Sequence, residues 1–236
     1  MSNSLNPDRL IDALPQAFKE NLKKGRQPLS IAFVCTANYN RSPALELLMK
    51  EALDEALLLP YIDVRSAGAR PWDGNGGPIN PYLIEEMKDE SRVRAEAMRS
   101  KAMEWSPNAK ELADVIFTVS FSHREILHRE YDVAWRKTIS LPHALQGSNT
   151  ELYDPQEAVG MALRNPTPKN IEAARTDTRR MLDELGPIVN EGIIPAFCKV
   201  AGIDVGPEVE TPKRLESEEA KNEYIQDYIQ RFYSEN

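Results

Sequence analysis

The residues best suited to chemistry in this 236-residue sequence are a cysteine and an arginine six positions apart, Cys35 and Arg41. A thiolate is a strong nucleophile, and a guanidinium offers a planar fork of N–H donors that matches two oxygens of a phosphate group. The residues between them, 36–40, form a short stretch with several polar side chains. The pair predicts a phosphate-binding loop with a nucleophile at its floor.

The residues on either side of this loop predict a strand that enters it and a helix that leaves it. Residues 31–34 form a short apolar run typical of a strand that is covered on both faces. Pro43 suits the first turn of a helix, and apolar residues recur at helical spacing over 44–58. The loop therefore lies at a helix N-terminus, where unpaired N–H groups and the helix dipole attract an oxyanion and stabilise a thiolate.

The rest of the chain alternates strands and helices. Strands are expected at 30–35, 61–68, 113–119 and 137–141. This order predicts an α/β fold, a three-layer, doubly wound, four-stranded parallel sheet with right-handed crossovers and helices on both faces. Ligands of such sheets bind beyond the carboxyl ends of the strands, where the strand order reverses. The loop after the first strand is expected at that edge.

Both ends of the chain are expected to add helices to this sheet. Residues 1–28 form an N-terminal extension, in which 8–24 has the pattern of one amphipathic helix. A central domain is expected over 29–187, closed by a helix over 168–185. A C-terminal extension, 188–236, then holds an apolar segment broken by prolines and glycines and an acidic amphipathic helix over 216–232. The two extensions are candidates for a homodimer contact.

Composition narrows the classes of partner and cofactor. The net charge of -8 disfavours nucleic acid and an anionic membrane surface as main partners, because both would repel the chain. Two cysteines and three histidines, without the spacing of a zinc site, indicate a reduced protein with neither metal nor cofactor: Cys35, Cys198, His123, His128 and His143. Neither a signal peptide nor a long apolar run is evident, so the expected location is the cytoplasm.

The spacing Cys-x5-Arg-Ser-Pro directly after the first strand resembles that of the low-molecular-weight protein tyrosine phosphatases. Three further motifs match in chain order: Ser66-Ala67-Gly68 at the end of the second strand, Ala113-Asp114 in the third, and Asp154-Pro155 after the fourth. The resemblance implies that 29–187 is a domain of this family. It also implies hydrolysis of a phosphomonoester without a cofactor, with protein tyrosine phosphatase as the expected activity.

The resemblance assigns three catalytic residues. Cys35 attacks phosphorus and forms a phosphocysteine, Arg41 holds the phosphate oxygens, and Asp154 acts as general acid and then as general base. Ser42 is expected to donate its hydroxyl to the sulfur, and Ser66 to brace the loop together with Asn38. The substrate-binding residues are expected to be Thr36, Ala37, Asn38, Tyr39, Asn40, Ser42 and Trp72, of which Trp72 would form an aromatic wall.

Some positions differ from the usual family pattern. Ala37 stands where glycine is usual, so a positive φ there would cost about 1 kcal/mol. Gln156 and Glu157 follow Asp154-Pro155 where tyrosine-directed members carry aromatic residues. The substrate is therefore expected to be a phosphorylated protein or a small phosphomonoester, and the choice between phosphotyrosine and another phosphomonoester stays open.

Two other functions compete with the phosphatase. An arsenate reductase would need further cysteines to pass on a disulfide, and only Cys198 is available. A non-catalytic phosphate-binding module with a degenerate site would explain Ala37 and Tyr39. Such a module has no use for a nucleophile and an acid, so the presence of Cys35 and Asp154 weighs against it.

Overall fold

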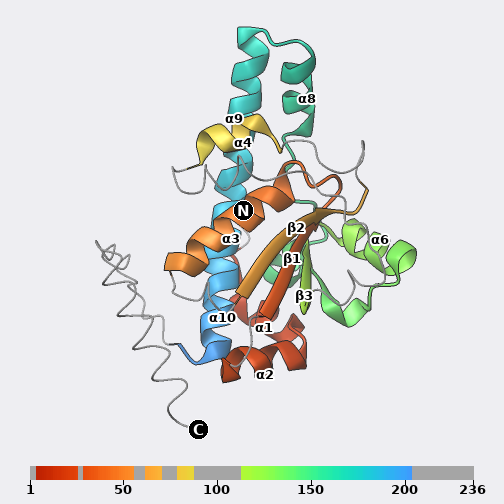
Figure 1. The fold of residues 1–236 in the computed structure, drawn as a ribbon, viewed down its shortest axis with the longest axis vertical. Coiled ribbons are helices and arrows are strands. Elements are labelled where there is room, and N and C mark those ends of the chain that lie inside the picture. Colours follow the sequence, from red (N-terminus) through yellow and green to blue (C-terminus); the bar gives the residue numbers. More distant parts are fainter. Residues whose placement is uncertain (1–3, 26–28, 56–61, 71–78, 88–112, 204–236) are drawn as a thin grey trace.

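The computed structural model describes residues 4–25, 29–55, 62–70, 79–87 and 113–203 (Figure 1). Its centre is a parallel sheet of four strands, β1 Leu29–Cys35, β2 Ile62–Gly68, β3 Val115–Thr118 and β4 Thr138–Ser140. The strand order is β2-β1-β3-β4, so the order reverses beside β1. The predicted four-stranded parallel sheet is confirmed, with the cysteine at the carboxyl end of β1.

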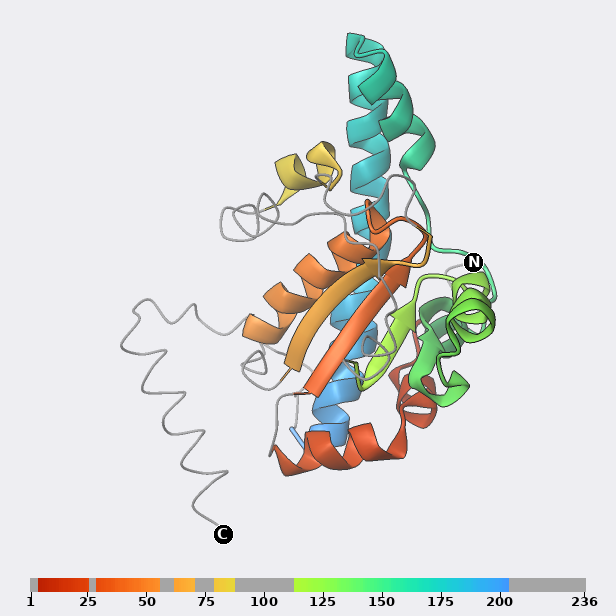
Figure 2. The same cartoon turned by 45° about the vertical axis from the view of Figure 1, so that its right-hand side comes forward.

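The two faces of β1 take part in different cores, because successive side chains of a strand point to opposite sides. Ile31 and Phe33 belong to the larger core with helix α3, Arg41–Glu55, and the helices near both ends of the described chain. Ala32 and Val34 belong to a smaller core with helix α6, Phe121–Tyr131. Figure 2 shows α6 on the side of the sheet away from α3. The predicted three layers are therefore present.

The N-terminal segment forms two helices, α1 Pro7–Ala13 and α2 Gln16–Lys24, so the expectation of one helix over 8–24 is wrong. The break falls at Leu14, which is extended with φ -63° and ψ 137°. The next residue is Pro15, whose ring disfavours helical backbone at the residue before it. Both helices still bury their apolar faces in the larger core.

The C-terminal part of the described chain is helical for longer than expected. Helix α9, Pro168–Pro187, continues through a π-helical segment η3, Ile188–Ile193, into α10, Ile194–Ala201. The expectation of a broken apolar segment after 186 is wrong up to Ala201, because tertiary packing outweighs the local preferences of glycine and proline. The ring of Phe197 lies 5.4 Å from that of Phe18 and 6.4 Å from that of Phe117. The helix expected over 216–232 lies outside the described residues.

The remaining elements complete the described fold: α4 Pro81–Glu86, the 3-10 helix η2 Trp135–Lys137, α7 Leu141–Gln146 and α8 Gln156–Arg164. Helix α8 was not predicted; it packs against α9 as a hairpin at one end of the molecule (Figure 1). The sequence also predicts that residues 82–112 are largely helical, and most of that stretch lies outside the described residues. Asp154-Pro155 leads directly into α8, next to the carboxyl edge of the sheet.

Candidate active site

The loop between Cys35 and Arg41, residues 36–40, lies directly against the end of β2. The Cα atoms of Cys35 and Gly68 are partners in the sheet, and the N–H of Arg70 donates to the carbonyl of Thr36 at 2.7 Å. A Cβ atom on Gly68 would stand 2.7 Å from the carbonyl carbon of Ala37 and 2.9 Å from the carbonyl oxygen of Thr36. Only glycine allows this close approach, which explains the Gly of the Ser-Ala-Gly motif.

The positive backbone angle of this loop occurs at Asn38, with φ 54°, and not at Ala37. Asparagine is among the residues that adopt this left-handed region most readily. The cost considered for an alanine at position 37 therefore does not arise. The loop is compatible with the residues that it contains.

The cysteine sulfur is hydrogen-bonded to the serine that follows Arg41. The Sγ of Cys35 lies 2.9 Å from the Oγ of Ser42. The same hydroxyl lies 2.9 Å from Asn38 Oδ1 and 3.2 Å from the carbonyl oxygen of Ala67. A hydroxyl has one proton, so these contacts compete for it. Ser42 is thus placed to donate to sulfur whenever the sulfur carries negative charge.

Asn38 also reaches the end of β2, where its Nδ2 donates to the carbonyl of Ser66 at 3.4 Å. The Oγ of Ser66 itself is buried and has no hydrogen-bond partner among the described residues. The Asn38–Ser66 contact is present, but it uses the serine backbone and not its hydroxyl.

Arg41 is 2% exposed, and its side chain links the loop to the segment 151–154. Its Nη2 lies 2.7 Å from Asp154 Oδ2, while its Nη1 pairs with Glu151 and donates to the carbonyl of Leu152 at 3.1 Å. Burial lowers the pKa of the guanidinium, but the charges of Asp154, Cys35 and Glu151 together raise it above its ordinary value. Both terminal nitrogens, the groups that would hold a phosphate, are engaged by this segment.

Asp154 is held by several groups at once. Its Oδ1 accepts hydrogen bonds from Asn40 Nδ2 at 2.8 Å and from the N–H of Gln156 at 3.2 Å. Gln156 and Glu157 are exposed in the first turn of α8. The carboxyl group thus lies beside the loop, joined to it through both Asn40 and Arg41, whereas the two residues that depart from the family pattern face solvent.

The structure adds two residues that the sequence analysis did not select, His123 and Glu151. The Nε2 of His123 is 2.8 Å from the Oγ1 of Thr36, and its Nδ1 contacts the Oγ of Ser120, the residue that caps α6. Burial, reinforced by the charge of Arg41, lowers the pKa of His123 to about 4. The ring is therefore neutral at pH 7, and its hydrogen bond with the Thr36 hydroxyl holds that side chain in place.

Other expected site residues have different surroundings. Tyr39 packs against a small apolar cluster beside α4, α8 and α9 that includes Tyr82, Val159 and Ala174. Trp72 lies outside the described residues. Cys198 is buried in the larger core, and burial raises the pKa of its thiol. Over the described residues the structure brings together Cys35, residues 36–42, Ser66 and Asp154 at one edge of the sheet.

Over the same ranges, no three His, Cys, Asp or Glu side chains are grouped so that they could hold a metal ion. Within the described part of the chain, every helix is too short or too polar to cross a membrane.

A parallel sheet whose first strand ends in a compact loop, with a cysteine before it and a buried arginine after it, defines a phosphatase-like class of α/β protein. Residues 30–183 match the family model described as low molecular weight phosphotyrosine protein phosphatase. The chain therefore belongs to this family of phosphatases.

Similar proteins include two curated relatives, both named protein-arginine-phosphatase. The one from Geobacillus stearothermophilus is 26% identical over 54% of this chain and 79% of its own length. The one from Bacillus subtilis is 28% identical over 54% of this chain and 79% of its own length.

Solved structures share the fold. A low molecular weight protein tyrosine phosphatase from T. tengcongensis matches with a TM-score of 0.51 and 20% identity, over 69% of this chain and 99% of that one. A protein tyrosine phosphatase from Entamoeba histolytica matches with a TM-score of 0.51 and 19% identity, over 70% of this chain and 94% of that one.

Proposed function

We propose that the protein hydrolyses phosphorylated protein side chains through a phosphocysteine intermediate on Cys35. The observation that carries this proposal is the 2.7 Å contact between Arg41 and Asp154. Through it, the arginine that follows the nucleophile loop and the proposed general acid share one site. A protein that only binds phosphate would not need an acid there.

In the first step the Cys35 sulfur attacks phosphorus, and an S–P bond forms as the bond to the leaving atom breaks. Asp154, protonated, gives its proton to that leaving atom. In the second step Asp154, now a carboxylate, takes a proton from water as the water oxygen attacks phosphorus. The S–P bond breaks, and the Ser42 hydroxyl, 2.9 Å from the sulfur, stabilises the departing thiolate.

Binding of the phosphate requires Arg41 to exchange partners. Its two terminal nitrogens contact Glu151 and Asp154, so substrate oxygens must replace at least one carboxylate. The backbone N–H groups of the loop and the guanidinium then stabilise the charge of the transferred group by electrostatics and position. In this scheme Asp154 leaves the guanidinium and turns to the leaving atom.

Two amino acids are candidates for the substrate residue that carries the phosphate. Phosphotyrosine is the substrate expected from the sequence, and phosphoarginine is the second candidate. Two observations favour phosphoarginine: the curated relatives are protein-arginine-phosphatases, and Glu151 and Asp154 place two carboxylates beside the guanidinium of Arg41. A departing guanidinium is cationic once protonated, and these carboxylates would stabilise it, whereas a phenol gains nothing from a second carboxylate.

The test compares peptides that carry phosphotyrosine or phosphoarginine, without added metal, in wild type and variants. Cys35→Ser should abolish turnover of both while the circular dichroism spectrum is kept, and Cys198→Ser should leave turnover unchanged. Asp154→Asn should slow aryl phosphates with poor leaving groups by about 10²- to 10⁴-fold, and those with good leaving groups far less.

Activity in Cys35→Ser would refute the nucleophile, and an equal loss for all leaving groups would refute Asp154 as the acid. Saturable anion binding without turnover would favour a binding module. Thiol oxidation driven by arsenate that outpaces hydrolysis would favour an arsenate reductase, although Cys198 is buried in the core. The ratio of kcat/KM for the two peptides decides between phosphotyrosine and phosphoarginine.

A further inference from the structure

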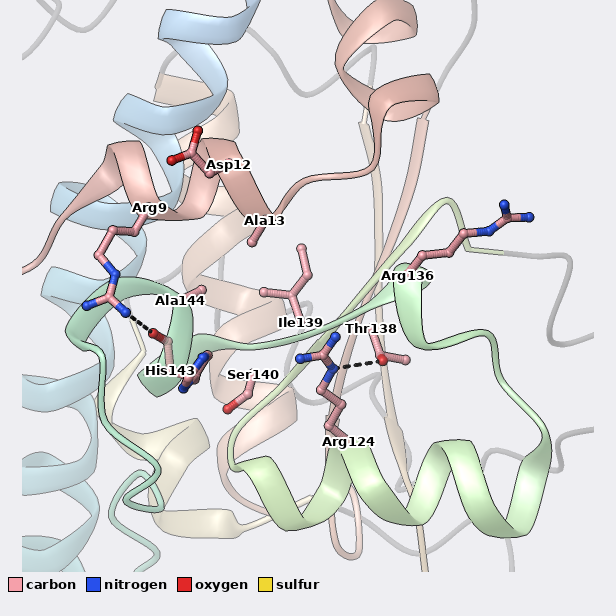
Figure 3. A pocket seen from close by; sticks show the side chains of 10 residues that line it. All are labelled: Arg9, Asp12, Ala13, Arg124, Arg136, Thr138, Ile139, Ser140, His143 and Ala144. Atoms are coloured by element: carbon pink, nitrogen blue, oxygen red, sulfur yellow. Dashed lines mark hydrogen bonds between the residues drawn. The ribbon is translucent and has the colours of Figure 1, made fainter.

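A cavity of about 360 Å³ lies at the outer edge of the sheet, beside β4 (Figure 3). Its walls come from α1, α6, η2, β4 and α7. β4 is the last strand in the order β2-β1-β3-β4, so the cavity is two strands away from β1 and its loop. None of the residues assigned to the phosphatase reaction lines it. It is therefore a separate site.

The charge around this cavity is opposite to that of the chain. Arg9, Arg124 and Arg136 line it together with one acidic residue, Asp12, in a chain whose net charge is -8. Several other arginines on the described surface are neutralised by an ion pair with a neighbouring carboxylate, as Arg70 is by Glu130. Among the described residues, no carboxylate lies within ion-pair distance of the three cavity arginines. Their positive charge is left for another partner.

Arg124 is the most firmly held of the three. Its Nε donates to Thr138 Oγ1 at 3.2 Å and its Nη2 to the carbonyl of Trp135 at 3.1 Å, while its guanidinium lies 3.9 Å over the Trp135 ring. These contacts fix the plane of the guanidinium but supply no negative charge. Burial lowers the pKa of Arg124 without any opposing carboxylate. A half-buried cation that is preorganised and not neutralised is what an anion site requires.

Arg9 approaches from the opposite wall. Its position is set by Asn6, whose side chain caps α1 through the N–H groups of Asp8 and Arg9. Its Nη2 donates to the carbonyl of His143 at 3.3 Å. Figure 3 shows Arg9 and Arg124 on two sides of the cavity, with Ser140 and His143 between them.

Ser140 supplies an independent sign of a missing polar partner. The residue is 1% exposed and lines the cavity, and its Oγ has no hydrogen-bond partner among the described residues. Buried hydroxyl groups are almost always hydrogen-bonded in native proteins, to protein or to a bound group. A ligand oxygen in the cavity would provide the absent partner.

From these contacts we infer that the β4-edge cavity is a binding site for the phosphate group of a small organic phosphate. Two guanidinium forks from opposite walls and a serine hydroxyl suit the several acceptor oxygens of a phosphate dianion. The volume lies at the lower end of the range for pockets that hold small organic ligands, about 300 to 1,000 Å³. It therefore accommodates an organic group beside the phosphate.

The test is a titration of the Cys35→Ser protein with glucose 6-phosphate, followed by the backbone amide signals in NMR spectra. Amides of 138–144 report the cavity, and those of 36–42 report the active site in the same sample. Glucose 6-phosphate should shift the signals of 138–144 saturably, whereas uncharged glucose should not. Inorganic phosphate shifting the same amides more weakly shows that the organic part contributes to binding.

Arg124→Gln should weaken binding at 138–144 by about tenfold or more, since a charge-assisted contact is lost. Arg9→Gln, which removes a more exposed side chain with fewer contacts, should weaken it by about two- to fivefold. Arg129→Gln is the matched control, because Arg129 lies on the same helix, is exposed and pairs with Glu125 outside the cavity. In spectra recorded without ligand, amide signals of 36–42 at the same positions as in the Cys35→Ser protein verify that each variant is folded.

The inference is overturned if glucose 6-phosphate produces no saturable shift at 138–144. It is equally overturned if Arg124→Gln and Arg9→Gln, both folded, bind with the affinity of the Arg129→Gln control.

Discussion

Removing the charge of Glu151 should strengthen phosphate binding in the active site. Arg41 uses Nη1 for Glu151 and Nη2 for Asp154, so the phosphate competes with two carboxylates. Asp154 is needed for proton transfer in the proposed mechanism, whereas Glu151 has no part in proton transfer and does not assist an aryl leaving group. Glu151→Gln therefore separates competition for Arg41 from catalysis.

The expected gain in phosphate affinity follows from the solvent exposure of the Arg41–Glu151 ion pair. The Glu151 side chain is 51% exposed although Arg41 is buried, so solvent screens much of the attraction. Exposed ion pairs contribute about 0.2 to 1 kcal/mol, and the buried partner places this pair near the upper end. About 1 kcal/mol corresponds to roughly fivefold tighter binding of phosphate in the variant.

The assay is inhibition of aryl phosphate hydrolysis by inorganic phosphate at low and high salt. We expect the inhibition constant of Glu151→Gln to fall by about fivefold at low salt, and the difference from wild type to shrink as salt screens the carboxylate. Glu157→Gln is the matched control, because it removes the same charge from the exposed first turn of α8. Phosphate binding that is unchanged or weaker in Glu151→Gln would show that Glu151 orients Arg41 and does not compete for it.

Three further predictions concern the loop and the core. Gly68→Ala should lower kcat/KM by about tenfold or more, because its Cβ would displace the loop, whereas Gly186→Ala, with open space around it, should keep full activity. The pKa of His123 is lowered to about 4, so as pH falls the unfolded state binds the proton before the folded state does. The free energy of unfolding, measured by denaturant, should therefore fall by about 2 kcal/mol between pH 7 and 5. His123→Gln should lack this loss. Phe197→Ala should destabilise by about 3 to 5 kcal/mol in the same experiment, and a loss below 1 kcal/mol would show that α10 is not part of the main core.

The sheet and the loop could be predicted because their signals are local. The apolar run before Cys35, the proline after Arg41 and the alternation of strands and helices fix a parallel sheet with a polar loop at its carboxyl edge. Asp154 was selected because the Asp-Pro pair after the fourth strand matches the general-acid motif of the family that the sequence resembles. The structure places it at Arg41, across a long separation in sequence.

The features that were missed depend on contacts between distant segments. Glu151 and His123 look like ordinary polar residues until the fold brings them to Arg41 and Thr36. The only local hints were the acidic residue three positions before Asp154 and the Ser-x-x-His capping pattern at 120–123. The glycine and proline at 186–187 indicated a helix end, but the apolar side chains after them are held in the core.

The continuous rod of α9, η3 and α10 determines how far this chain can be shortened. The family match stops at residue 183, yet Phe197, further along the rod, covers the rings of Phe18 and Phe117. A version that keeps the N-terminal helices but ends at residue 183 would expose the rings of Phe18 and Phe117, and an exposed aromatic surface favours self-association. The smallest autonomous unit for crystallography or directed evolution should therefore retain the polypeptide through Ala201.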